Sequence, residues 1–286
     1  PTVRAACSVV SPQGRPYREN PAITAFYEDL LNPFGVGFDE ESLRTGRNVF
    51  HQDLVDNLID ADDDAGSRKP DLIIVTHALP DVHPFTTVAS HLNMVVGGGT
   101  AKSFSISEQG LAAPFTALRI AAAFHASGRS SLSMIAVLEQ TTLPTRLPLV
   151  HDNELVDSGV VLLLGHGQGM RVAGVRTVMP GESVRDRIVA LVGGQPGQTL
   201  VVAGSRVDAD AIPDGLPVRW CDPATYCTSV WVELAEHHDA WRAEYSAVVL
   251  CDSEPRSGRT HLALLAGSTI SAVPEGVRYA GFRRDS

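Results

Sequence analysis

The chain has 286 residues, of which 44% are hydrophobic and 20% are charged, and its formal net charge is −10. These proportions are close to those of an average globular protein, and they exclude an intrinsically disordered or collagen-like chain. A surface that binds nucleic acid needs clustered Lys and Arg to neutralise phosphates, so the negative charge argues against a nucleic-acid partner.

Neither a membrane segment nor a disulfide framework is expected. The apolar runs are much shorter than the roughly 20 residues that a bilayer-spanning helix needs. The first residues, Pro1 to Arg4, lack the apolar stretch of a secretory signal, which predicts a cytoplasmic protein. The chain has no CxxC pair, so we expect free thiols and no structural zinc. The four cysteines are Cys7, Cys221, Cys227 and Cys251.

Apolar periodicity predicts alternating strands and helices in the first half of the chain. The predicted strands are Val3–Val10, Asp71–Thr76, Phe104–Ser107 and Ser131–Leu138. The predicted helices are Ile23–Leu31, a helical stretch over residues 38–60, Thr86–Asn93 and Ala112–His125, and Asp60–Lys69 is predicted to be a charged surface loop. The Ala-rich segment Ala112–His125 is the longest helical pattern, and its Pro114 suits a first helical turn.

The second half repeats this style, which predicts an α/β protein with mixed or parallel sheets. Its predicted strands are Val160–Leu164, Val172–Thr177, Leu200–Ala203, Ala247–Cys251 and His261–Leu265, and its predicted helices are Val184–Val192 and Thr228–Arg242. The Pro-containing stretch Thr141–Asp157 suggests a division into two similar halves, residues 1–150 and 151–286.

Two local patterns are interpreted as structural. Gly165-His166-Gly167-Gln168-Gly169 follows a predicted strand, but its glycine spacing does not fit a dinucleotide loop, and Gly167 stands where a nucleophile elbow needs Ser. We therefore interpret it as a strand connection. The ten histidines show no His-Glu-x-x-His pattern, so no metal site is predicted.

The segment around the Ala-rich helix resembles a known family. It resembles the nucleophile segment of thiolase-superfamily condensing enzymes, and most of all that of β-ketoacyl-ACP synthase III and its acyltransferase relatives. The matching residues run from Phe104-Ser105-Ile106-Ser107-Glu108-Gln109-Gly110-Leu111 through Ala112-Ala113-Pro114-Phe115-Thr116-Ala117-Leu118-Arg119-Ile120-Ala121. Further likenesses are the strand Asp71–Thr76, the strand Ser131–Leu138 and the segment Asp157–Leu162.

The resemblance implies a thiolase-like fold with five layers, α-β-α-β-α, and two similar halves. Ala112–His125 and Thr228–Arg242 would be the two central buried helices, related by a pseudo-two-fold axis. It also implies a homodimer, or a heterodimer with a catalytic ketosynthase, paired through the strand Phe104–Ser107. An α/β binding or regulatory domain of another fold is the alternative, and it would lack these two central helices.

The resemblance also implies a Cys-His-Asn catalytic set, and this chain departs from it at all three positions. The family's Cys falls on Leu111, its His on Gly204 and its Asn on Cys227. Leucine is not a nucleophile, and a thiolate is needed to accept the acyl group in family-type condensation. The resemblance therefore implies a degenerate, pseudoenzyme-like condensing enzyme of fatty-acyl or polyketide-type natural product biosynthesis, whose catalytic status the sequence leaves uncertain.

Two functions remain open at this point. The chain could be a non-catalytic subunit that pairs with an active condensing enzyme. It could also be an autonomous acyltransferase that acts on acyl-CoA or acyl-carrier-protein thioesters without a Cys nucleophile. For that second function the weak candidate residues are Ser107, Glu108 and His151, together with Ser105 and Cys227. No cofactor is expected, although acyl-CoA or an acyl-carrier protein is a possible substrate or partner.

Overall fold

Ten strands form one continuous mixed sheet in the computed structural model, which describes residues 1–61, 68–193 and 198–267. The strand order is β3-β2-β4-β5-β1-β6-β10-β9-β7-β8. The strands are β1 Thr2–Val10, β2 Leu72–His77, β3 Lys102–Ile106, β4 Leu132–Glu139, β5 Ser158–Gly165, β6 Met170–Val178, β7 Thr199–Ala203, β8 Val218–Trp220, β9 Ala247–Glu254 and β10 Arg259–Ala266.

The sheet consists of two halves with the same internal order. Strands β1–β5 are arranged 3-2-4-5-1, and strands β6–β10, counted from β6, are arranged in the same way. In each half the fifth strand runs antiparallel to its two neighbours, whereas the second strand runs parallel to the third and fourth. A short pairing of β1 with β6 joins the halves. The order therefore shows the internal duplication that the resemblance implies.

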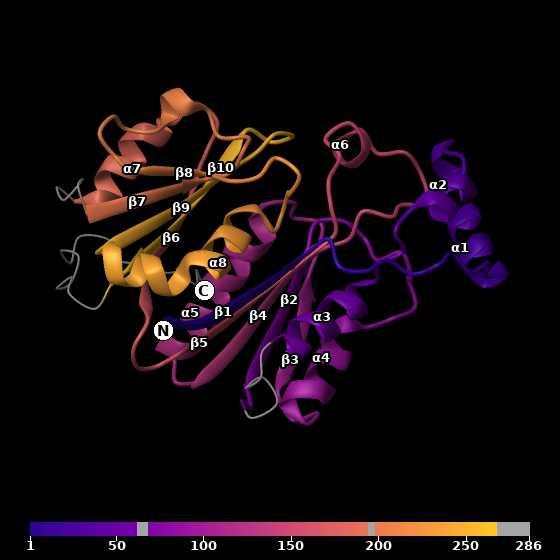
Figure 1. The fold of residues 1–286 in the computed structure, drawn as a ribbon, viewed down its shortest axis with the longest axis horizontal. Coiled ribbons are helices and arrows are strands. Elements are labelled where there is room, and N and C mark those ends of the chain that lie inside the picture. The colour runs from indigo at the N-terminus through magenta and orange to yellow at the C-terminus, as the bar shows by residue number, and fades with distance from the viewer. Residues whose placement is uncertain (62–67, 194–197, 268–286) are drawn as a thin grey trace, which may run out of the picture.

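The helices complete five layers, α-β-α-β-α (Figure 1). The helices α5 (Ala112–Ala126) and α8 (Ser229–Glu244) lie between the two half-sheets. The helices α3 (His51–Asp60) and α4 (Val88–Gly97) cover the outer face of the first half-sheet, and α7 (Val184–Val192) covers the second. The helices α1 (Pro21–Leu31) and α2 (Glu40–Thr45) project from this body, and α6 (Pro148–His151) lies near them.

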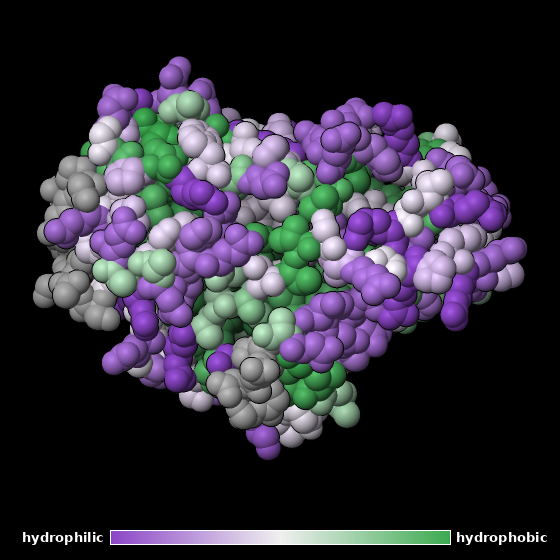
Figure 2. Space-filling model, in the orientation of Figure 1, coloured by the Kyte–Doolittle hydropathy of each residue, from purple (hydrophilic) through white to green (hydrophobic). Residues whose placement is uncertain are grey.

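Three separate apolar clusters hold these layers together. The largest contains residues of both half-sheets together with α5 and α8, and the other two lie under the outer helices. Strands β2 and β5 are buried on both faces, which explains their uninterrupted apolar sequences. Ala113, Ala117 and Ala121 are fully buried on α5, and their small side chains let this helix approach both sheets closely. Figure 2 shows hydrophilic residues over most of one face, broken by hydrophobic residues near its centre.

Most predicted elements are present, but the helical stretch over residues 38–60 is two helices, α2 and α3. A Cβ at Gly46 would lie 2.6 Å from Thr142 Cγ2 and 2.8 Å from the Ser42 carbonyl oxygen. Asn48 follows with a left-handed backbone at φ 54°, and its amide nitrogen donates to the carbonyl oxygens of Leu43 and Gly46. Helical periodicity alone does not reveal this break.

The structure also bears on several other predictions. The predicted loop Asp60–Lys69 falls largely outside the described residues. Strand β5 pairs with β4 and β1, although it follows the predicted boundary at residue 150, and the division there stays a prediction. No disulfide joins the four cysteines within the described residues. Within the described segments, no helix has the length and the apolar composition needed to cross a membrane.

Candidate functional site

A cavity of about 740 Å³ opens at the N-terminal end of the central helix α5. Its walls come from the segment before α5, the loop after β2, the loop before α8 and the β9–β10 hairpin. The lining includes Glu108, Gly110, Arg119, Thr177, Tyr226, Glu254, Arg256, Arg259 and His261. Because these segments lie far apart in the sequence, the cavity depends on the packing of the two half-sheets around α5.

The segment that leads into α5 is tightly constrained. Leu111 immediately precedes the helix and is 2% exposed, within the central apolar cluster. Gly110 has a left-handed backbone at φ 52°, and a Cβ there would lie 2.2 Å from Glu254 Oε2. Only glycine fits this conformation and this close approach. An aliphatic side chain therefore occupies the position where the resemblance places a nucleophile.

The carboxylate of Glu254 meets the N-terminus of α5. The backbone N–H of Leu111 donates to Glu254 Oε2 at 3.1 Å, and the Tyr226 hydroxyl donates to the same oxygen at 2.6 Å. Burial, followed by this carboxylate, raises the pKa of the Tyr226 hydroxyl. The guanidinium of Arg206 lies over the Tyr226 ring, 5.3 Å from its centroid. These contacts fix an acidic group where a negatively charged reaction intermediate would otherwise be stabilised.

Cys227 is held in a second buried acidic environment. The backbone N–H groups of Tyr226 and Cys227 donate to the Glu139 carboxylate, and the Cys227 thiol donates to the Leu138 carbonyl oxygen at 3.3 Å. Burial raises the pKa of Glu139 to about 7. Burial and the nearby Glu139 carboxylate raise the pKa of the Cys227 thiol well above its ordinary value, so the thiol stays protonated.

Gly204 lies against a third buried acid. A Cβ at Gly204 would lie 2.1 Å from Asp252 Oδ1, so no larger side chain, and no histidine, fits at this position. Burial raises the pKa of Asp252 to about 7. The three positions that the resemblance marks, Leu111, Gly204 and Cys227, therefore each contact or adjoin a buried carboxyl group. Their assignment as the family's catalytic positions stays a prediction.

His261, which the sequence analysis did not single out, lines the same cavity. It lies on β10 directly opposite Thr177 on β6, and its Nδ1 is 3.2 Å from Thr177 Oγ1. Its ring packs on Phe115 of α5 at a centroid distance of 5.5 Å. Burial lowers the pKa of His261 to about 4, so the imidazole is neutral near pH 7. A cross-strand pair has no signature in a single sequence, so pattern reading could not find it.

The other candidate residues are dispersed. Ser105 and Ser107 are exposed at the edge strand β3 and just after it, and neither lines the cavity. Glu108 does line the cavity and is exposed. His151 is exposed on α6, where its Nδ1 lies 3.1 Å from the backbone nitrogen of Leu147. The structure thus brings Glu108 to the α5 site but leaves the two serines and His151 outside it.

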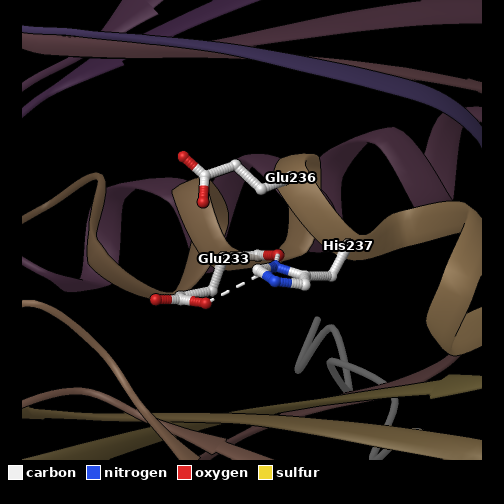
Figure 3. A group of neighbouring side chains, drawn as sticks. All are labelled: Glu233, Glu236 and His237. Carbon is white, nitrogen blue, oxygen red and sulfur yellow. Dashed lines mark hydrogen bonds and ion pairs between the residues drawn. The ribbon is translucent and has the colours of Figure 1, made fainter.

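Among the described residues, Glu233, Glu236 and His237 of α8 form a group close enough to hold a metal ion. Figure 3 shows the Glu233 carboxylate directed toward the His237 ring, and His237 Nδ1 is 3.6 Å from Glu233 Oε2. The same carboxylate accepts a hydrogen bond from Arg219 Nε at 2.8 Å. A metal ion would have to displace this guanidinium, so the group does not indicate a metal centre.

The sequence matches no family model, and no curated protein matches it. Solved structures with the same arrangement do exist. A variant of OleA from Xanthomonas campestris is 14% identical with a TM-score of 0.58, over 93% of this chain and 97% of that chain. β-Ketoacyl-[acyl carrier protein] synthase III (FabH) from Thermus thermophilus is 17% identical with a TM-score of 0.57, over 93% and 99%.

A third similar structure is AbyA1, a tetronic acid condensing enzyme. It is 13% identical with a TM-score of 0.59, over 93% of this chain and 99% of that chain. At these identities the likeness concerns the fold alone. The chain therefore has the thiolase-like fold of β-ketoacyl synthase III, as the segment around α5 predicted.

Proposed function

We propose that this chain is a synthase III-like subunit of fatty-acyl or polyketide-type metabolism that binds an acyl thioester without catalysing condensation. It would pair with an active condensing enzyme and shape that enzyme's substrate selection. The observation that carries this proposal is the state of the α5 N-terminus, where Leu111 is buried and Glu254 accepts its backbone N–H. Condensation through an acyl-enzyme needs a nucleophile at this place.

The described cysteines do not replace the missing nucleophile. Burial raises the thiol pKa of Cys221, Cys227 and Cys251, which keeps them protonated near pH 7. Cys7 lies on β1, between β5 and β6, and not in the cavity lining. The proposed substrate class, an acyl group carried on coenzyme A or on an acyl-carrier protein, is supported by the likeness to a structure named β-ketoacyl-[acyl carrier protein] synthase III.

The edge of the sheet supports the pairing part of the proposal. Strand β3 has β2 as its neighbour on one side and is terminal in the strand order of the described sheet. An open strand edge readily pairs with another chain. Beside it, α4 exposes Met94 at 67% and Val95 at 45%, apolar area that a partner subunit would cover.

Reconstitution with a catalytic homologue tests this proposal. We expect the purified chain to form no condensation product from acyl-CoA or acyl-carrier-protein substrates and to gain no acyl mass in intact mass spectrometry. Together with a catalytic condensing enzyme, it should copurify and change that enzyme's rate or chain-length preference. Condensation by the chain alone, at a rate typical of a condensing enzyme, would refute the proposal.

The second candidate is an autonomous acyltransferase without a cysteine nucleophile. The Thr177–His261 pair in the cavity favours it, because a neutral imidazole within hydrogen-bond distance of a hydroxyl can act as a general base. Under this alternative, the chain alone consumes acyl-CoA, and both Thr177→Val and His261→Gln abolish this activity. Consumption that survives both substitutions would exclude the pair as its source.

A further inference from the structure

The N-terminal end of α5 already holds an anion, supplied by the chain itself. Unpaired N–H groups and the helix dipole make a helix N-terminus a natural place for a negative group. Here the group is the carboxylate of Glu254, which accepts the Leu111 N–H at 3.1 Å. The two residues are 143 positions apart in the sequence, so the contact exists only because the β9–β10 hairpin packs against the start of α5.

Both oxygens of this carboxylate are held in place. Oε2 also accepts the hydroxyl of Tyr226 at 2.6 Å, and Oε1 accepts the backbone N–H of Arg256 at 3.3 Å. Glu254 is 8% exposed, and it approaches Gly110 so closely that a Cβ there would lie 2.2 Å from its Oε2. The carboxylate is therefore a fixed part of the cavity wall and not a mobile surface group.

We infer that the Glu254 carboxylate keeps a second anion away from the N-terminus of α5, although Arg119, Arg256 and Arg259 line other parts of the same cavity. A thiolate, an oxyanion or a ligand carboxylate at this place would meet a like charge in a buried setting. The inner end of the cavity is then left to the uncharged part of a ligand, such as the intact acyl group of a thioester. This ligand class rests on the proposed function, whereas the exclusion of anions does not.

A direct consequence concerns the nucleophile position. A cysteine at a free helix N-terminus has its thiol pKa lowered from about 8.5 into the range of about 3.5 to 7.5. A fixed carboxylate nearby acts in the opposite direction by about 1 to 3 pKa units. Replacing Leu111 by Cys should therefore not restore an activated nucleophile, and Glu254 must be neutralised as well.

The experiment measures the thiol pKa of the introduced cysteine in two backgrounds. We expect Leu111→Cys to have a thiol pKa of about 8.5 or higher. In Leu111→Cys/Glu254→Gln the pKa should be lower by at least about one unit. The pKa is obtained from the ultraviolet absorbance of the thiolate against pH, and the alkylation rate by iodoacetamide is followed on the peptide that contains position 111. Wild type and Glu254→Gln give the background of the native thiols.

Glu108→Gln, combined with Leu111→Cys, is the matched control. Glu108 lines the same cavity three residues before Leu111, but it is exposed, so water screens its charge. We expect this substitution to change the thiol pKa by less than about 0.3 units. Equal effects of the Glu108 and Glu254 substitutions would contradict the inference.

The single variant can still overturn the inference if the double variant fails to fold. A thiol pKa well below about 8.5 in Leu111→Cys alone would show that the helix end is free, and it would overturn the inference. The measurement needs neither a partner nor a substrate. If the proposed subunit function fails, this result is therefore unaffected. If the inference about Glu254 fails, the proposed subunit function is likewise unaffected.

Discussion

Three buried carboxyl groups, Glu139, Asp252 and Glu254, surround the positions where the resemblance places a Cys-His-Asn set. Each accepts a backbone hydrogen bond: from Tyr226 and Cys227 for Glu139, from Ser253 for Asp252, and from Leu111 for Glu254. Burial raises the pKa of Glu139 and of Asp252 to about 7, so these two groups make the stability of the protein depend on pH.

Glu139 offers the clearest test at this scale. Burial raises its pKa from 4.5 to about 7, so the folded state binds more protons than the unfolded state between these values. The stability that protonated Glu139 adds to the folded state is therefore fully present below about pH 4.5, and it is lost as pH rises through about 7. Glu139→Gln cannot ionise and should gain stability over wild type between about pH 5 and about pH 8, by about 3 kcal/mol at most.

Urea denaturation of both proteins at these two pH values measures this difference. Glu28→Gln, at an exposed position of α1, is the control and should show the same pH dependence as wild type. If Glu139→Gln loses stability relative to wild type as pH rises, the assignment of Glu139 as a buried, protonation-prone acid is wrong.

At the scale of elements, helix α5 depends on small side chains where it passes between the half-sheets. Ala117 is fully buried on the face that packs into the central cluster. Ala117→Leu adds volume to a close-packed interior and should lower the free energy of unfolding by about 1 to 3 kcal/mol. Ala123→Leu, on an exposed part of the same helix, is the control and should change it by less than about 0.5 kcal/mol.

Thermal denaturation compares these two variants. If Ala117→Leu loses no more stability than Ala123→Leu, then α5 is not tightly enclosed by both half-sheets.

The residues at the two ends of α5 are also consistent with its boundaries. Pro114 stands in the first turn of α5, where its missing N–H costs nothing, and Gly128 follows the helix with a left-handed backbone at φ 68°.

At the scale of the whole molecule, the edge strand β3 and the adjacent face of α4 are the expected contact with a second subunit. Met94→Arg places a charge within this apolar area, which would have to be desolvated on pairing. We therefore expect the variant to shift toward the monomer, or to lose a catalytic partner, in analytical ultracentrifugation. Val189→Arg removes a similarly exposed apolar residue from α7, on the second half-sheet, and should leave the association state unchanged.

An unchanged association state in Met94→Arg, together with dissociation in Val189→Arg, would place the interface on the other side of the molecule. The duplicated strand order makes this comparison informative. Strands β3 and β8 occupy equivalent positions at opposite ends of the described sheet, so each half offers one open edge. Only one of them is tested by the Met94 substitution.

Much of the fold could be predicted because secondary structure depends on short-range patterns. The buried strands β2, β4 and β5 are apolar runs, and α5 is an Ala-rich helix with Pro in its first turn. Strand β8 was not predicted, since Val218–Trp220 is short and partly exposed. The break between α2 and α3 was not predicted either, because at this place the Asn48 N–H bonds to the hydroxyl of Thr142, a residue far along the chain.

The sequence by itself determined the alternation of strands and helices, the position of the central helix and the aliphatic residue at its start. Only the tertiary structure decided what surrounds that residue. Glu254 meets Leu111 across 143 positions, Glu139 meets Cys227 across 88, and His261 meets Thr177 across 84. Such contacts leave no periodic trace in the chain, because they join strands, loops and a helix start that lie far apart in the sequence.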